Sequence, residues 1–315
     1  MSAAEEPVYR GRFAPSPTGP LHFGSLVAAV ASYLDARSRE GKWLVRMEDL
    51  DTPRIQPGAA DHILRTLDRF GFTWDEPVLY QSARTEAYRE AFEELRARGA
   101  VFPCGCTRKE IADSALRRGD PAGQRYPGTC RNGLPDGRAA RSWRVRVCPG
   151  AVTFTDRLQG TQSQDLEQTV GDFVVLRADG IFAYQLAVVV DDAAQGITDI
   201  VRGVDLIDST PRQIYLQRLL GLASPRYLHT PVAVNAEGQK LSKQTHAPVI
   251  DAHRPVEQLI AALCFLGQDP PAELAGASLG DLWKWAIASW QPGRIPAVEA
   301  LPAPTRFSQT SGSNA

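Results

Sequence analysis

Apolar and polar positions in the first hundred residues change their period several times, which predicts alternating helices and strands. Residues 25–40 carry apolar side chains at helical spacing, and residues 43–48 alternate as a strand does. Two further amphipathic helices are predicted over 61–70 and 82–99, the second with Ser82 as its N-cap. Helices that alternate with strands in this way favour the parallel sheet of an α/β protein.

The second half of the chain continues this alternation with shorter elements. We predict strands at 152–155, 173–176 and 197–201, and a helix at 209–221. Residues 183–190 are almost continuously apolar, which we interpret as a parallel strand buried on both faces. From residue 223 we expect a long loop, and beyond residue 250 one or two helices.

These elements predict a doubly wound, Rossmann-like α/β fold that is interrupted by an insertion. Between Val101 and Gly150 the chain is rich in Gly, Pro and Arg and holds four of its five cysteines. The expected parts are the first half of a catalytic domain at 1–99, an inserted sub-domain at 100–170, the second half at 171–250, a short helical C-terminal part at 251–291 and a disordered tail at 292–315. Sheets of this class bind ligands at the carboxyl ends of their strands.

Composition narrows the class of protein without identifying its chemistry. The chain has 315 residues, 43% of them hydrophobic, and a net charge of −1, so it can bury a core and is not basic overall. No apolar run has the length of a membrane span, and the N-terminal residues lack a signal region. Five cysteines, an odd number, favour a reducing compartment over a disulfide framework. We therefore expect a cytoplasmic protein with no membrane partner, acting as a monomer.

The stretch from Arg12 to Ser25 lies just before the first predicted helix. It contains three prolines and two glycines, which hold it out of regular structure. The start of a helix offers free N–H groups and the positive end of the helix dipole, which suit a phosphate group. Taken alone, this stretch could equally be a structural loop.

A second stretch far along the chain, the run KLSKQ at 240–244, favours the phosphate interpretation. Together with LHFG at 21–24, it resembles the paired signature motifs of class I aminoacyl-tRNA synthetases. The preceding PSPTGP is similar to the glutamyl branch of that family, and the resemblance covers residues 9–248. Ser25 stands where many class I enzymes have a second histidine, a departure that the glutamyl branch tolerates.

The resemblance implies that glutamate is activated with ATP, accompanied by Mg²⁺, to form glutamyl adenylate. Departure of pyrophosphate requires hydrogen-bond donors and cations that stabilise the developing charge. The residues implied in catalysis are His22, Lys240 and Lys243. Those implied in ATP binding are His22, Gly24, Ser25 and Lys243.

The resemblance also implies a glutamate pocket, in which a carboxylate binds the ammonium group and guanidinium groups bind the carboxylates. The residues implied are Arg12, Phe13, Ala14, Pro15, Ser16, Glu48, Arg202 and Tyr184, the last of which could instead belong to the core. Glu48 could simply pair with Arg46. Arg202 could pair with Asp199 or Asp205 and only order its loop.

The insertion carries a possible metal site at Cys104, Cys106 and Cys130. Three thiols lack a fourth ligand, and buried free cysteines are the alternative. Members of the glutamyl branch that modify queuosine have a Cys-x-Cys…Tyr-x-x-x-Cys pattern, and Tyr126 completes it here as the fourth ligand of a structural Zn²⁺. Cys148 and Cys264 are expected to be small core residues.

Basic charge is concentrated in the same insertion. From Arg96 to Arg146 there are twelve Lys or Arg and four Asp or Glu, which favours contact with RNA phosphates over a merely solvated face. Only 65 residues follow residue 250, too few for the two anticodon-reading domains of ordinary glutamyl-tRNA synthetases. The resemblance therefore implies tRNA-independent activation of glutamate and its transfer to queuosine in the anticodon loop of tRNA(Asp). A truncated enzyme that charges a tRNA 3′ end and a non-catalytic RNA-binding protein are the alternatives.

Overall fold

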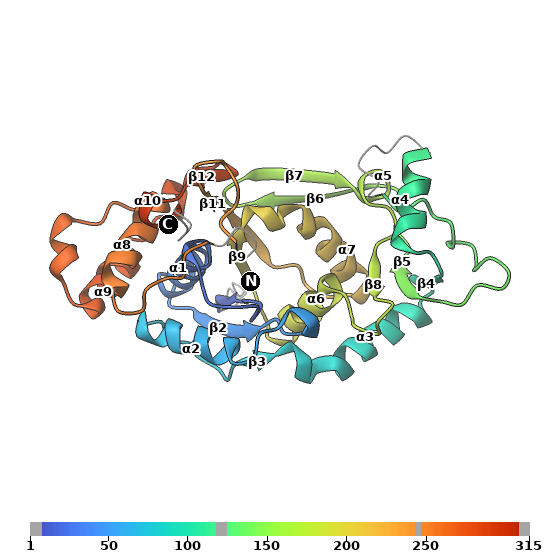
Figure 1. Cartoon of the computed structure of the whole chain (residues 1–315), viewed down its shortest axis with the longest axis horizontal. Helices are drawn as coiled ribbons and strands as arrows, with labels where there is room; N and C mark the ends of the chain where they lie inside the picture. Colours follow the sequence, from blue (N-terminus) through green and yellow to red (C-terminus); the bar gives the residue numbers. More distant parts are fainter. Residues whose placement is uncertain (1–7, 118–124, 243–246, 309–315) are drawn as a thin grey trace, which may run out of the picture.

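The N-terminal part of the protein forms three parallel strands connected through helices (Figure 1). The computed structural model describes residues 8–117, 125–242 and 247–308. Its first elements are β1 (Arg10–Phe13), α1 (Phe23–Arg37), β2 (Lys42–Met47), α2 (Ala59–Arg69) and β3 (Leu79–Tyr80). In the register of β1 and β2, Arg12 lies opposite Leu44, and in that of β2 and β3, Met47 lies opposite Tyr80. The predictions of α1, β2 and α2 are confirmed.

A second set of parallel strands lies beside the first. Its elements and the helices that cover them are α3 (Thr85–Ala97), α6 (Tyr184–Ala194), β9 (Asp199–Gly203), α7 (Thr210–Leu220) and β10 (Arg226–Thr230). β9 and β10 are parallel, and β1 lies against β9, where the Thr198 amide donates to the Arg10 carbonyl over 3.0 Å. The strand predicted at 197–201 and the helix predicted at 209–221 are confirmed, and Gly221 ends that helix with a φ of 67°.

The insertion forms a small antiparallel sheet and a long hairpin at one end of the molecule (Figure 1). Its elements are β4 (Val101–Cys104), α4 (Arg108–Arg117), β5 (Ser142–Val145), β6 (Ala151–Asp156), β7 (Gly160–Asp165), α5 (Leu166–Thr169) and β8 (Val174–Leu176). β5 pairs with both β4 and β8, and β6 pairs with β7. At its end β6 also joins β10 through Asp156 and Tyr227, which attaches the hairpin to the parallel strands.

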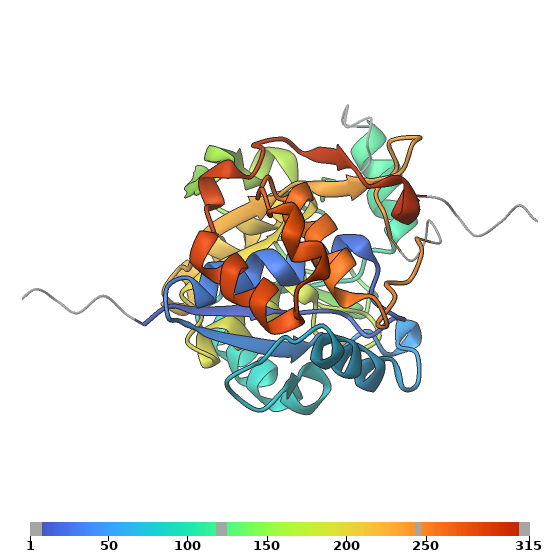
Figure 2. The ribbon, with the colours of Figure 1, turned by 90° about the vertical axis from the view of Figure 1, so that its left-hand side faces the viewer.

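The C-terminal part packs against α1 at the other end of the molecule (Figure 2). It contains β11 (Val232–Val234), α8 (Pro255–Phe265), α9 (Leu279–Ser289), β12 (Ala300–Pro302) and α10 (Thr305–Ser308). Short 3₁₀ helices occur at Thr52–Arg54, Gln81–Arg84, Val204–Ser209, Ala272–Gly276 and Pro292–Arg294. Among the described residues, no helix is long and apolar enough to cross a membrane.

Two hydrophobic cores cover the two faces of the parallel strands. Trp43, Val45 and Met47 of β2 point into a core shared with α1, α8 and α9. Leu44, between them in sequence, points into a second core with α3, α6 and α7. Because successive side chains of a strand point to opposite faces, both faces of β2 are buried, as expected for a doubly wound sheet.

The prediction of a buried strand at 183–190 is wrong, because this segment begins helix α6. The helix is buried almost all round, so its sequence shows no polar face that would reveal a period of 3.6. Its length of 11 residues exceeds that of a typical strand. Polar side chains within it, such as Gln185 and Asp192, are buried with hydrogen-bond partners on other elements.

Three further predictions differ from the structure. Ser82 does not cap α3, because its amide and hydroxyl bind the Asp49 carboxylate at 2.8 and 2.6 Å and a 3₁₀ turn precedes the helix. The loop expected from residue 223 contains β10 and β11. The tail expected to be disordered from residue 292 is ordered as far as residue 308, because β12 pairs with β11 and Phe307 stacks on Phe23 at 4.3 Å.

Candidate active site

A cavity of about 410 Å³ lies at the carboxyl ends of β1, β2 and β9. Most of the predicted substrate and catalytic residues line it, namely Arg12, Phe13, Ala14, Pro15, Ser16, His22, Gly24, Ser25, Glu48, Tyr184, Arg202 and Lys240. Lys243 lies outside the described residues. The structure therefore brings together three segments that are far apart in the sequence, and it does so at the sheet edge where ligands of such folds bind.

The N-terminus of α1 forms one wall of this cavity. His22 is the N-cap of the helix, with an extended backbone, and its Nδ1 accepts the Ser25 amide at 3.3 Å. A Cβ on Gly24 would lie 3.2 Å from the His22 ring, so glycine lets the ring lie close against the helix start. His22 is thus both a helix cap and a cavity residue, and the two interpretations of its role are compatible.

A buried chain of charges connects β1, α6 and β2 behind the cavity. Asp192 Oδ1 accepts from Arg12 Nε at 3.1 Å and from Arg46 Nη1 at 2.8 Å, and Arg46 Nη2 lies 3.5 Å from Glu48 Oε1. Burial tends to raise the pKa of Asp192, but the two guanidinium groups outweigh it and the pKa is lowered. For Glu48 burial prevails over Arg46 and Arg12, and its pKa is raised. The pairing of Glu48 with Arg46 is present, and Glu48 also lines the cavity.

Arg202 is held by a different network, composed of neutral acceptors. Its Nε donates to His229 Nε2 at 3.0 Å, and its Nη2 donates to Thr210 and Gln213, both at 2.8 Å. Its Nη1 is buried and has no hydrogen-bond partner in the part of the chain that the structure describes. Asp199 pairs with Arg226 instead.

His229 and Asp156 continue this network away from the cavity. His229 Nδ1 lies 2.7 Å from Asp156 Oδ2, and both side chains are fully buried. Burial lowers the pKa of His229 more than the bond to Asp156 raises it. Burial would raise the pKa of Asp156, but the bond to His229 and those from backbone amides outweigh it, so the pKa is lowered. A neutral His229 with its proton on Nδ1 leaves Nε2 free to accept from Arg202.

The other predicted residues lie where β9, α6 and the signature loop meet. Lys240 Nζ is 2.5 Å from Asp205 Oδ2. Asp205, one of the two alternative partners considered for Arg202, is therefore paired with Lys240. The backbone of Lys240 also forms an isolated antiparallel β-bridge with Val234 at the end of β11. Tyr184 is the first residue of α6 and not the end of a strand, and burial raises its pKa.

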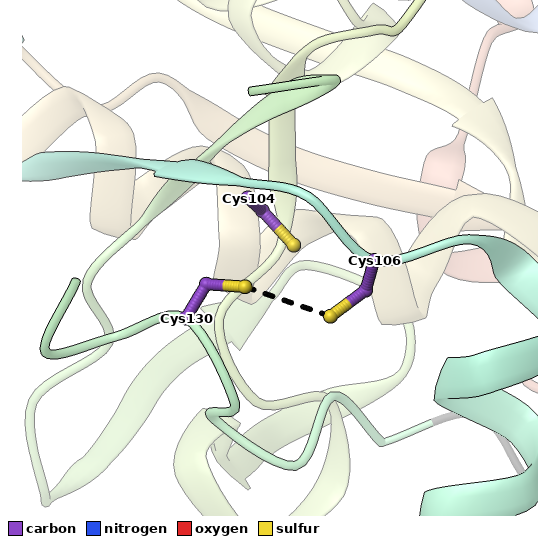
Figure 3. Close-up of side chains that lie close together, drawn as sticks. All are labelled: Cys104, Cys106 and Cys130. Atoms are coloured by element: carbon purple, nitrogen blue, oxygen red, sulfur yellow. Dashed lines mark hydrogen bonds between the residues drawn. The ribbon is translucent and has the colours of Figure 1, made fainter. Parts of the chain in front are cut away.

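The cysteine cluster lies in the insertion, outside this cavity. Figure 3 shows the thiols of Cys104, Cys106 and Cys130 turned toward one another, and their sulfurs lie within 4.8 Å of one another. The Tyr126 hydroxyl oxygen is 3.3 Å from Cys104 Sγ and accepts the Cys130 amide at 2.9 Å.

Four donors that converge in this way suit a structural zinc ion. Burial and the neighbouring thiols raise the pKa of Cys106 to about 12, so this thiol stays protonated unless a cation is bound. Burial would also raise the pKa of Cys104, but hydrogen bonds, above all the one with Tyr126, outweigh it and the pKa is lowered. Cys104, Cys106 and Cys130 could hold a metal ion, and the Tyr126 hydroxyl lies close enough to be considered as the fourth ligand. Cys148 and Cys264 are exposed, so their assignment to the core is wrong; Cys148 lies in the turn before β6, and Cys264 lies on the outer side of α8.

Three functional candidates were missed from the sequence: Asp156, Asp192 and His229. None belongs to a recognisable motif. The one signal for Asp192 is a pair of acidic residues at the end of an otherwise apolar run. For Asp156 and His229 no local signal exists, because they meet only through the pairing of β6 with β10.

The fold and the cavity define the class of protein. Residues 9–273 match the model of the family described as tRNA synthetases class I (E and Q), catalytic domain. The architecture is also similar to that of the glutamate-tRNA synthetase of Elizabethkingia anophelis, with a TM-score of 0.79 and 23% identity over 96% of this chain and 69% of that one. This likeness concerns the fold alone.

Curated relatives identify the branch. The chain is 60% identical over 308 residues to the glutamyl-Q tRNA(Asp) synthetase of Aromatoleum aromaticum, covering 98% of this chain and 97% of that one. It is 61% identical over 296 residues to the protein of the same name from Dechloromonas aromatica, covering 94% and 98%. The chain belongs to the glutamyl-Q tRNA(Asp) synthetase family.

Proposed function

We propose that this protein activates glutamate with ATP, without tRNA, and transfers the glutamyl group to queuosine in the anticodon loop of tRNA(Asp). The observation that carries the proposal is the state of Arg202. It lines the cavity, its Nη1 has no partner among the described residues, and no ion pair there neutralises it. A buried guanidinium without a counter-ion suits a carboxylate ligand. The names of the relatives support glutamate as that ligand and tRNA(Asp) as the acceptor.

In the proposed glutamate site, each charged group of the substrate meets a side chain of opposite charge. Arg202 binds the side-chain carboxylate, and Glu48 binds the ammonium group. Arg12 uses its Nε for Asp192, so its terminal nitrogens are left for the substrate. Phe13 to Ser16 and Tyr184 complete the walls. Because Asp192 joins Arg12 to Arg46 and thereby to Glu48, one buried network positions Arg12 and Glu48, while Arg202 is positioned separately by His229, Thr210 and Gln213.

Activation joins the α-carboxylate of glutamate to the α-phosphorus of ATP and breaks the bond to pyrophosphate. The negative charge that develops on pyrophosphate is stabilised by His22 at the start of α1 and by Lys240 and Lys243 of the signature loop. Gly24 and Ser25 offer backbone amides to the nucleotide, and Mg²⁺ accompanies the phosphates. In the second step a hydroxyl group of queuosine attacks the glutamyl carbonyl, and AMP leaves.

We further propose that the chain works as a cytoplasmic monomer, divided as expected into a split catalytic domain (1–99 and 171–250), an insertion (100–170) and a helical C-terminal part from residue 251. A Zn²⁺ on Cys104, Cys106, Tyr126 and Cys130 would stabilise the insertion and take no part in the reaction.

The test is to incubate the protein with radiolabelled glutamate, ATP and separate purified tRNAs, with and without queuosine, and to measure ATP–pyrophosphate exchange without tRNA. We expect exchange without tRNA, and label only on tRNA(Asp) that carries queuosine. Label on a tRNA 3′ end would instead support a truncated glutamyl-tRNA synthetase. Absence of exchange would support a non-catalytic RNA-binding protein.

A further inference from the structure

A second cavity, of about 320 Å³, lies in the insertion and is lined by four arginines. Arg108 comes from the start of α4, Arg141 and Arg144 from β5 and the residue before it, and Arg177 from the turn after β8. The cavity thus lies at the end of the molecule opposite to α8 and α9 (Figure 1). Asp179 is the one carboxylate among the described residues that line it, so these residues carry an excess of three positive charges.

Two of these arginines are exposed and not engaged. The side chains of Arg108 and Arg141 make no hydrogen bond or ion pair with any residue that the structure describes. Glu110, two residues after Arg108 on the same helix, is bound by Arg138 at 2.5 Å and by the Thr107 amide at 2.8 Å. The two guanidinium groups therefore line the cavity with no counter-ion supplied by the residues that the structure describes.

The other two arginines are fixed in the cavity wall. Arg144 is only 8% exposed; its Nη1 donates to the Asp172 carbonyl at 2.8 Å, while its Nε is buried without a hydrogen-bond partner in the described chain. Arg177 pairs with Asp179 at 2.7 Å and with Asp51 at 3.2 Å. Asp51 follows Glu48 by three residues, so this wall is tied to the loop that leaves the glutamate site.

We propose that this cavity binds a phosphate group of the RNA backbone. Guanidinium groups bind phosphates through two parallel charged hydrogen bonds, and a phosphate oxygen could accept from Arg108, from Arg141 and from the buried Nε of Arg144 that lacks a partner among the described residues. The local excess of basic residues from Arg96 to Arg146 favours a polyanion over a small free anion. The inference rests on the proposed function for the identity of the RNA but not for the phosphate contact itself.

The test compares the double variant Arg108→Gln/Arg141→Gln with the variant Lys109→Gln. Lys109 is exposed on the same helix, outside the cavity lining, and so controls for the loss of positive charge as such. Binding of tRNA(Asp) and of one unrelated tRNA is measured by fluorescence anisotropy at several salt concentrations. A phosphate contact is independent of sequence, so both RNAs should respond alike.

We expect the double variant to raise the Kd for both RNAs by about tenfold or more, and to reduce the slope of log Kd against log salt by about one. ATP–pyrophosphate exchange without RNA should be unchanged. Lys109→Gln should change the Kd by less than about twofold. Equal effects of the double variant and Lys109→Gln would overturn the proposal, as would a loss of exchange in the double variant.

A last arm separates RNA from a free anion. Inorganic phosphate is titrated by calorimetry into the unaltered protein and the double variant. If the double variant loses phosphate binding but keeps the original Kd for RNA, the cavity serves a free anion and the proposal is wrong. Because binding is measured without glutamyl transfer, failure of the proposed reaction with tRNA(Asp) leaves this test able to decide.

Discussion

Arg202 differs from Arg12, which also lines the cavity, and from Arg46 behind it in how its charge is compensated. Arg12 and Arg46 share the carboxylate of Asp192, whereas Arg202 is bound by a histidine, a hydroxyl and an amide. Neutral acceptors orient a guanidinium without cancelling its charge. The substrate carboxylate would therefore be the counter-ion that this residue lacks, and glutamine, with its neutral amide, could not replace it.

We predict that Arg202→Gln raises the KM for glutamate by at least about tenfold while the KM for ATP changes little, because a charged, two-pronged hydrogen bond is lost. Steady-state exchange kinetics with each substrate varied would measure both constants. Arg226→Gln is the matched control, since Arg226 pairs with Asp199 on the neighbouring strand and does not line the cavity. If both constants rise equally, Arg202 is structural.

Asp156 determines which nitrogen of His229 carries the proton. Its Oδ1 accepts the amides of Leu158 and Gln159 at 2.9 and 2.8 Å, and its Oδ2 faces His229 Nδ1. In Asp156→Asn the amide oxygen must stay with those backbone amides, so the NH₂ group faces the ring and donates to it. The ring proton would then move to Nε2, which could no longer accept from Arg202.

We therefore predict that Asp156→Asn raises the KM for glutamate by about tenfold or more and leaves kcat within about threefold. Asp35→Asn is the control, because Asp35 is equally buried but binds Arg157 and Arg39, and no hydrogen bond joins it to His229 or Arg202 in the described chain. Exchange kinetics and urea unfolding are measured on both variants. If both variants lose the same stability and do not differ in their KM for glutamate, Asp156 has only a structural role.

The lowered pKa of His229 also predicts a dependence of stability on pH. Its ordinary value is 6.5, so below that pH the unfolded chain binds a proton that the folded chain excludes, and the free energy of unfolding falls as the pH decreases. Urea unfolding at about pH 7.5 and about pH 5.5 should show this loss in the unaltered protein and a smaller loss in His229→Gln. The same loss in both would mean that other groups cause it.

The sequence predicted the residues that carry a motif but not those that position them. His22, Glu48 and Arg202 could be found because they lie in signature motifs or at the ends of recognisable strands. Asp192 and His229 could not, because the first lies in a helix mistaken for a strand and the second acts through strand pairing. Such long-range pairing has no local sequence signal.

At the scale of elements, α6 shows why an apolar run is ambiguous. Its residues are buried on all sides by α3, α7 and the sheet, so helical and strand periods fit the sequence equally well. In α2 one face is exposed and the other buries Ile63 and Leu67. The helical period of this segment was therefore evident, and the prediction was correct. Burial on all sides removes the contrast on which such predictions depend.

The cysteine cluster connects two elements of the insertion, β4 and the loop that contains Tyr126 and Cys130. We predict that Cys104→Ser releases zinc and lowers the melting temperature of the insertion, while exchange without tRNA is retained, since the cluster lies outside the glutamate cavity. Metal analysis and thermal unfolding test this. Cys148→Ser, at an exposed thiol, should retain the metal. A fully folded protein without zinc would show that the thiols are merely buried.

At the scale of the whole molecule, the last described residues pack against the first helix, α1. Phe307 is 5% exposed, stacks on Phe23 and belongs to the core around α1. The sequence suggested disorder here because prolines and small polar residues prevail, and the scattered apolar side chains among them give little local signal. Phe23, on which Phe307 stacks, lies almost three hundred positions earlier in the chain.

We predict that Phe307→Ala lowers the free energy of unfolding by about 3–5 kcal/mol, as expected for truncating a buried phenylalanine. Chemical denaturation measures this value. Val298→Ala, at an exposed side chain in the same segment, should change it by less than about 0.5 kcal/mol. A small effect of Phe307→Ala would mean that this segment contributes little to the fold.

The pairing of β12 with β11 has a consequence for how the protein is made in the cell. β11 leads into Lys240 and the signature loop, and its partner β12 is synthesised only after α8 and α9. A nascent chain can therefore fold β1, α1 and β2 early, but it lacks the strand beside the signature loop until β12 has left the ribosome. Glutamate activation should begin only after that point in synthesis.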